Sequence, residues 1–145
     1  MKTLFLALIL TLCAYADNIN QTLGYAPDYA TAAASAKAAD KPLMVMVVAT
    51  ECDWCRKMEI ETLSDPQVSA AVNTKLTVTV INKDTDKSEF LDAHPAPQTP
   101  MLYFVDAVND ELIFENLGYI KKETFLEMLD DIVTDYHEDE DEDDE

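Results

Sequence analysis

Two cysteines three residues apart, in the stretch Cys52-Asp53-Trp54-Cys55, constrain this chain more than any other feature. They follow the apolar run Leu43 to Ala49, which predicts a strand that ends where a helix begins. Cys52 then stands at a helix N-terminus, where unpaired N–H groups and the helix dipole favour a thiolate. Cys55 lies one turn further along, within reach of a disulfide. The spacing by itself indicates either a redox site or a metal site.

The rest of the chain favours the redox interpretation. A zinc site needs four ligands, but His94 and His137 stand far apart in the sequence and Cys13 falls in a segment that we expect to be removed. A disulfide that closes so small a loop would stabilise the fold little. The methionines of the apolar runs suit a core better than a copper site. We therefore predict no metal and no cofactor besides the Cys52–Cys55 disulfide itself.

The first 16 residues have the pattern of a removable export signal. Lys2 precedes the apolar run Leu4 to Cys13, which is too short to span a bilayer, and Ala14-Tyr15-Ala16 supplies an A-x-A cleavage site. Leu12 is too bulky for the position before a lipoprotein cysteine. We expect cleavage after Ala16 and export, to a bacterial periplasm as first choice and to the exterior as second.

Charge restricts the partners. The formal net charge is −19, which disfavours nucleic acid and anionic lipid surfaces. Residues 138–145 are eight consecutive acids, so residues 135–145 are predicted to form a disordered tail. Residues 17–26 are polar without clear periodicity and are predicted to be a flexible lead-in. The length between them, residues 27–134, predicts one domain.

The hydrophobic pattern predicts an α/β domain. Proline breaks and apolar spacing predict helices over 27–39, 53–62, from 66 onward and over 87–93, and strands over 43–49, 76–81, 101–105 and 112–115. Phe125, Leu129, Ile132 and Val133 share one face of a last helix. The last two strands are joined by a short polar link and should be antiparallel.

A βαβ unit followed by a ββα unit, with two cysteines at the first strand-to-helix junction, resembles the thioredoxin fold. The resemblance covers roughly Pro27 to Val133 and includes Thr99-Pro100 before the third strand and Gly118 before the last helix. Lys41-Pro42-Leu43 and Ser64-Asp65-Pro66 resemble an exported thioredoxin-related subfamily. The implied architecture is a central mixed sheet flanked by helices, with an extra N-terminal helix.

Thiol–disulfide exchange needs an attacking thiol and a resolving thiol. Cys52 suits the first role by its position, and Cys55, on the inward side of the helix, suits the second. The resemblance implies a cis bond before Pro100 and a Thr99 backbone that pairs with the substrate, and it adds Gly118 to the substrate-binding residues. Trp54 is a candidate substrate contact, with packing over the motif as an equal alternative.

Two departures from the family concern proton transfer and charge. A buried acid common in the first strand is replaced by Met46, and Thr50-Glu51 stands where a tryptophan is common before the first cysteine. Glu51 and Asp53 oppose a thiolate, whereas Arg56 and Lys57 favour it, so we expect a moderately lowered thiol pKa.

A moderately lowered thiol pKa is typical of a reductase. We therefore predict that the protein reduces protein disulfides and receives electrons from a membrane-embedded donor. We expect it to be a monomer. Two alternatives stay open. One is a binding or chaperone-like module that uses the acidic tail, and the other is metal delivery through the thiols.

Overall fold

The computed structural model describes residues 15–142, and its centre is a four-stranded sheet in the order β2-β1-β3-β4. β1 (Leu43–Val48) is parallel to β2 (Thr77–Asn82) and antiparallel to β3 (Met101–Asp106). β3 pairs antiparallel with β4 (Glu111–Leu117), with an irregular register after Phe104. The prediction of a mixed α/β sheet is confirmed, with β2 and β4 as the two edge strands.

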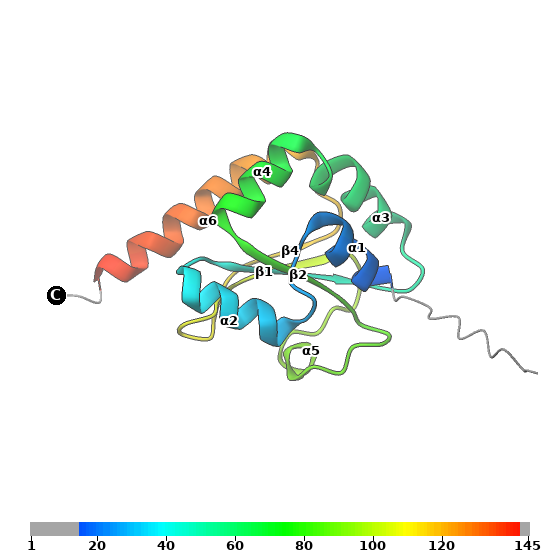
Figure 1. Ribbon diagram of the computed structural model, residues 1–145, viewed down its shortest axis with the longest axis horizontal. Helices are drawn as coiled ribbons and strands as arrows, with labels where there is room; N and C mark the ends of the chain where they lie inside the picture. Colours follow the sequence, from blue (N-terminus) through cyan, green and yellow to red (C-terminus); the bar gives the residue numbers. More distant parts are fainter. Residues whose placement is uncertain (1–14, 143–145) are drawn as a thin grey trace, which may run out of the picture.

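Helices cover both faces of this sheet, as Figure 1 shows with α4 and α6 on one side of the strands and α2 and α5 on the other. The first face carries α1 (Tyr15–Leu23), α3 (Asp53–Lys57), the π-helical segment η1 (Met58–Leu63), α4 (Pro66–Lys75) and α6 (Lys122–Glu142). The second face carries α2 (Tyr29–Ala39) and the short α5 (Glu89–Ala93). Because both faces are covered, every residue of β1 is buried.

The helix starts follow from local chemistry. The Asp28 carboxylate accepts a hydrogen bond from the Thr31 N–H at the start of α2, and Asp65 caps α4, with Pro66 in its first turn. In α2 the small side chains Ala32 and Ala36 are the buried ones, so this helix packs close to the sheet. The predicted helix after the cysteines exists, but its second half is π-helical.

The prediction of a flexible lead-in over residues 17–26 is wrong, because most of this segment is helix α1. Ala16 and Ile19 are buried in the core, and Leu23 packs against it, which is the i, i+3, i+7 spacing of a helix face. The predicted lead-in begins at Asp17, after the expected cleavage site, and so leaves out Ala16, the first residue of this spacing. The polar Asn20 is also buried. Its side-chain amide is satisfied there, because Nδ2 donates to the Val80 carbonyl and Oδ1 accepts from the Val80 N–H.

The predicted start of a disordered tail at residue 135 is also wrong. Helix α6 continues to Glu142, and its last turns extend beyond the sheet in Figure 1. Tyr136 follows Ile132 by one turn, is buried, and its hydroxyl donates a hydrogen bond to Asp40 Oδ1 at 3.2 Å. Residues 143–145 and residues 1–14 of the predicted export signal lie outside the described residues.

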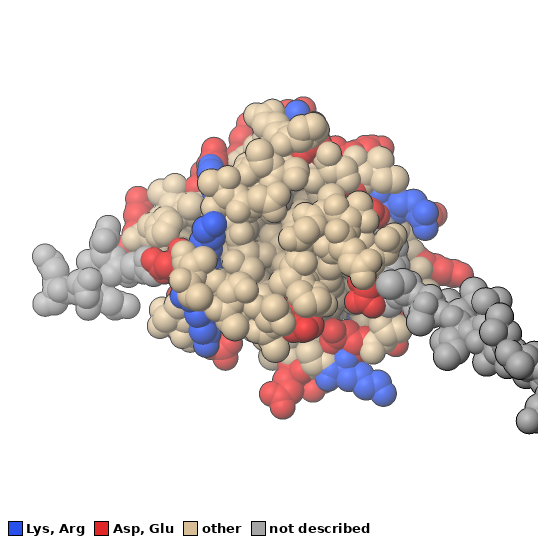
Figure 2. Space-filling model, viewed as in Figure 1, with Lys and Arg blue, Asp and Glu red and all other residues tan. Residues whose placement is uncertain are grey.

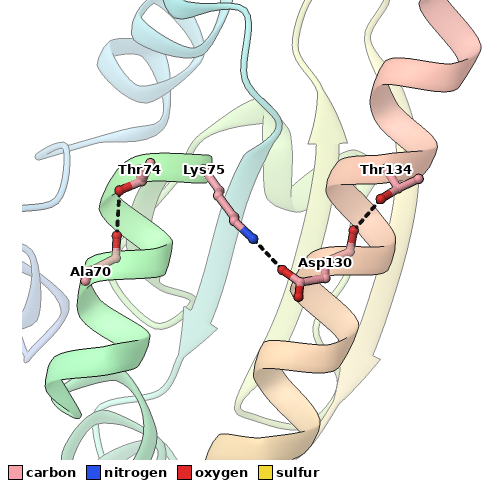
Figure 3. A network of polar contacts seen from close by, with 5 residues as sticks. All are labelled: Ala70, Thr74, Lys75, Asp130 and Thr134. Carbon is pink, nitrogen blue, oxygen red and sulfur yellow. Dashed lines mark hydrogen bonds and ion pairs between the residues drawn. The ribbon is translucent and has the colours of Figure 1, made fainter.

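Helices α4 and α6 lie side by side and are joined by the ion pair between Lys75 and Asp130 (Figure 3). Thr74 and Thr134 donate their hydroxyl protons to the carbonyls of Ala70 and Asp130 within their own helices. These groups are exposed and contribute little to stability. The two helices are held mainly by their shared core, to which Val68, Val72, Phe125 and Leu129 belong.

Candidate active site

The buried strand β1 leads into a disulfide between Cys52 and Cys55. Cys52 is the N-cap of α3, with an extended backbone, and its Sγ accepts a hydrogen bond from the Cys55 N–H at 3.1 Å. Cys52 is half-buried, whereas Cys55 is fully buried in the core. An incoming sulfur atom can therefore approach Cys52 more readily than Cys55.

A second segment reaches the disulfide from the start of β3. The peptide bond between Thr99 and Pro100 is cis, the isomer that the resemblance implied. Thr99 Oγ1 donates a hydrogen bond to Cys52 Sγ at 3.2 Å. The Pro100 carbonyl accepts one from the Gly118 N–H at 2.8 Å. Gly118 has a φ of 96°, which favours glycine. The fold thus brings together residues 52, 99, 100 and 118.

Trp54 lies at the surface of the site, with 58% of its area exposed. One side of its ring faces Tyr119 at a centroid distance of 6.1 Å. Lys57 Nζ lies 5.1 Å from the centre of the Trp54 ring and 4.5 Å from that of Tyr119. These are distances typical of cation–π contacts. Trp54 therefore packs on neighbours and also presents a large surface to solvent.

The aromatic partner of Trp54 is not among the residues predicted from the sequence. Tyr119 donates its hydroxyl proton to Glu61 Oε2 at 3.0 Å, and partial burial together with this hydrogen bond raises the pKa of Tyr119. Glu61 Oε2 also lies 3.9 Å from Nζ of Lys57, which is one helical turn away. The i, i+4 spacing of Lys57 and Glu61 could have indicated this pair, and the place of Tyr119 directly after Gly118 could have indicated its proximity to the site.

A second contact that is not predicted from the sequence positions the loop before Cys52. The Thr50 N–H donates to Asp84 Oδ2 at 2.8 Å, and Asn82 Nδ2 donates to Thr50 Oγ1 at 3.3 Å. The hydrogen bonds from Thr50 lower the pKa of Asp84. The sequence does not reveal the link between residues 84 and 50, because it depends on the parallel pairing of β1 and β2.

The charges around the disulfide have the predicted arrangement. Met46 is fully buried in the core, so no carboxylate stands at that position. Glu51 and Asp53 are exposed on either side of Cys52, and Arg56 and Lys57 occupy the last turn of α3. Among residues 16–138, whose side chains the structure describes, no three His, Cys, Asp or Glu side chains are arranged to hold a metal ion. None of the described helices combines the length and apolarity needed to cross a membrane.

Comparison with known proteins gives one family match. The family described as "Thioredoxin-like domain" matches residues 29–132. A search among curated proteins gave no significant match.

Solved structures show the same relationship. A solution structure of a thioredoxin from Thermus thermophilus has a TM-score of 0.65 and 28% identity, and the match covers 72% of this chain and 82% of that one. The oxidised C-terminal domain of DsbD from Neisseria meningitidis has a TM-score of 0.58 and 23% identity, covering 70% of this chain and 90% of the domain. A DsbH oxidoreductase has a TM-score of 0.60 and 15% identity, and the match covers 74% of this chain and 82% of that one. The latter two likenesses concern the fold alone.

Proposed function

The chain belongs to the thioredoxin-like domain family and is a thiol–disulfide oxidoreductase, and from that premise we propose that it is exported and reduces disulfides of protein substrates. Its own disulfide would be reduced again by a membrane-embedded dithiol donor, because an oxidising periplasm supplies no thiol pool. Export rests on the pattern of residues 1–16.

The position of Cys52 carries the proposal. Its sulfur is half-buried, accepts the Cys55 N–H and receives the Thr99 hydroxyl, so two donors would stabilise a thiolate at this atom. Cys55 is buried behind it and cannot meet a large substrate first. Cys52 is thus the nucleophile and Cys55 the resolving thiol of this proposal.

The reaction takes place in two exchange steps. The Cys52 thiolate attacks one sulfur of the substrate disulfide, which forms a mixed disulfide and releases the other substrate sulfur as a thiolate that takes up a proton. The Cys55 thiol loses its proton and attacks Cys52 Sγ, which releases the second substrate thiol and forms the Cys52–Cys55 disulfide. Two electrons pass from the dithiol to the substrate. A donor dithiol returns them by the same exchange in reverse.

Substrate contacts follow from the surroundings of Cys52. The backbone of Thr99, next to the cis peptide bond, would pair with the substrate chain, and Trp54 and Gly118 would border it. Glu51 and Asp53 oppose a strongly stabilised thiolate, which favours the direction of reduction. Oxidants of this chemistry have a strongly stabilised reduced form.

The reduction potential tests the direction. We expect a value closer to that of thioredoxin, about −270 mV, than to that of a strong oxidant, about −120 mV. Replacing both neighbouring acids, Glu51→Gln with Asp53→Asn, should shift the potential toward the oxidising end because it removes charge that opposes the thiolate. A wild-type value near −120 mV would contradict the reductase proposal.

Substrate capture tests the roles of the two cysteines. The Cys55→Ala variant should accumulate mixed disulfides with protein substrates through Cys52, and the matched Cys52→Ser variant should accumulate none. Insulin reduction should be lost in both. If Cys52→Ser left both insulin reduction and partner binding unchanged, a binding module without redox function would be the better explanation.

A further inference from the structure

The outer edge of β4 exposes three large apolar side chains. Leu112, Phe114 and Leu117 are 44%, 41% and 51% exposed, and no strand among residues 15–142 pairs with this edge. Proteins commonly protect such edges with lysine, proline, other charged side chains, a bulge or a covering segment. β4 contains neither lysine nor proline, and its bulge and its two glutamates leave these three apolar side chains exposed. An apolar edge of this kind marks a site where another chain can bind.

A groove of about 560 Å³ runs beside β4 on the face of the sheet that carries α5. Its lining includes Pro95, Pro97, Met101, Tyr103, Leu112 and Leu117. α5 is only five residues long, and Leu112 and Leu117 on this face stay exposed.

The walls of the groove are fixed by hydrogen bonds. Tyr103 donates its hydroxyl proton to the Pro95 carbonyl at 2.8 Å, and Lys83 Nζ donates to the Ala96 carbonyl at 3.0 Å. The segment that forms one wall is thereby tied to β3 and to the end of β2. The groove is formed before any partner arrives, so binding would not require the cost of ordering this segment.

One end of the groove lies at the disulfide end of the sheet. Leu117 is in register with Met101, and Met101 with Val47 near the end of β1. Neighbouring strands are about 4.8 Å apart, so Leu117 lies roughly 10 Å across the sheet from the strand that leads to Cys52. A polypeptide that meets Cys52 could therefore continue along β4.

Charge indicates what kind of polypeptide would bind. Glu115 lines the groove and Glu111 begins the strand, and neither makes an ion pair within the described part of the chain. Asp106 ends β3, Asp110 lies in the adjoining turn, and β4 itself has no basic residue. A second copy of the chain, with a net charge of −19, would be repelled here. A segment with lysine or arginine between apolar residues would be attracted.

We propose that β4 and its groove bind an extended, basic and apolar segment of the protein substrate. The segment adds to the sheet as a fifth strand. On the groove face it places apolar side chains beside Leu112 and Leu117 with a basic side chain beside Glu115 between them, and on the opposite face it brings a basic side chain to Glu111. The proposal rests on the proposed function in one respect, namely that the partner is a protein whose disulfide reaches Cys52.

A cysteine-free peptide, Lys-Val-Thr-Lys-Thr-Ile-Lys-Thr, tests the surface apart from any redox reaction, because as a strand it presents Val, Lys and Ile on one face and its other two lysines on the opposite face. We expect the full chain in its disulfide form to bind it, with amide chemical shift changes concentrated in residues 111–117 and an affinity that falls with salt. A matched peptide with glutamate in place of each lysine should bind at least about tenfold more weakly.

Variants locate the binding. Leu112→Ser should weaken binding of the basic peptide by about tenfold, since it removes an apolar contact in the groove. Glu115→Gln should weaken it less and reduce its salt dependence. Val108→Ser is the matched control, because Val108 is 54% exposed in the turn but outside the groove lining, and should leave binding unchanged.

Several results would overturn the proposal. These are the absence of binding, equal binding of the two peptides, shift changes confined to other elements, or a dimer formed through β4 at micromolar concentration. A protein that binds the peptide but reduces no disulfide would contradict only the proposed function. A protein that reduces insulin but does not bind the peptide would contradict only the β4 surface.

Discussion

The two edge strands of the sheet differ in whether another segment hydrogen-bonds to their outer edge. At β2 the Asn20 side chain donates to the Val80 carbonyl at 2.9 Å and accepts from the Val80 N–H at 2.8 Å. The Ala26 N–H donates to the Val78 carbonyl at 2.9 Å, and Thr79 Oγ1 donates to the Ala26 carbonyl at 2.9 Å. At β4 no comparable segment lies along the edge within the described residues, and its apolar side chains are exposed.

Residues 15–26 therefore occupy the place beside β2 that a further strand would otherwise take. α1 and the bridge at Ala26 satisfy backbone groups of β2 that would otherwise be open to pairing with another chain. Figure 2 shows the covered side, where uncharged side chains spread over α1 and α2 and charged ones lie mostly at the periphery. A closed edge contributes to stability, whereas an open edge is available for binding. The predictions below separate these two roles.

Removal of the cover from β2 should have the largest effect. A chain that begins at Pro27 loses the buried Ile19 and the hydrogen bonds of Asn20, so we expect its free energy of unfolding to fall by roughly 3–5 kcal/mol. Urea unfolding measures this change. The control is the chain that begins at Asp17, the predicted product of signal cleavage, which keeps both residues. Equal stability of the two forms would contradict a role of α1 in closing the edge.

The amide of Asn20 is the most specific part of that cover. Asn20→Ala should lower the free energy of unfolding by about 2 kcal/mol, because it leaves the Val80 N–H and carbonyl without partners in a buried place. Asn18→Ala, at an exposed position of the same helix, should change it by less than about 0.5 kcal/mol. Similar losses in both variants would indicate that only helix propensity matters.

The open edge should respond weakly in stability. Leu112→Ser is expected to change the free energy of unfolding by less than about 1 kcal/mol, because Leu112 is 44% exposed and its replacement leaves no cavity in the core. Val78→Ala on β2 is the matched comparison, and its buried side chain should cost about 2 kcal/mol. A large loss of unfolding free energy in Leu112→Ser would mean that Leu112 contributes to the core, which would contradict its role as a binding surface.

A small pH effect should mark the covered side near the active site. The hydrogen bonds from Thr50 lower the pKa of Asp84, so the ionised carboxylate stabilises the fold at neutral pH, and this contribution is lost as the pH falls through the lowered pKa. Asp84→Asn should therefore be less stable than the wild type at pH 7. The gap should close in acid, as the pH falls through the lowered pKa of Asp84. Thermal unfolding at pH 7 and in acid measures it, and a gap that widened in acid would contradict the assignment.

Local patterns predicted the parts of the molecule that depend on local interactions. The run Leu43 to Ala49 predicted β1, and the four-residue motif predicted that Cys52 begins a helix and Cys55 points inward. The position of Thr99-Pro100 beside the cysteines came from the resemblance. Asp84 could not be placed beside the site from the sequence, because it reaches Thr50 through the parallel pairing of β1 and β2. For Tyr119 the sequence offers one indication, its place directly after Gly118, but its contact with Trp54 depends on the tertiary structure.

The sequence by itself determined the redox motif, the central strand and the α/β order, because each is encoded in consecutive residues with a characteristic period. Only the tertiary structure decided the edges of the sheet. Residues 112–114 are as apolar as a core strand, yet they stand at an open edge, whereas the polar Asn20 is buried. The reason is physical: burial depends on which element lies alongside, and a strand position is an edge only with respect to the whole sheet.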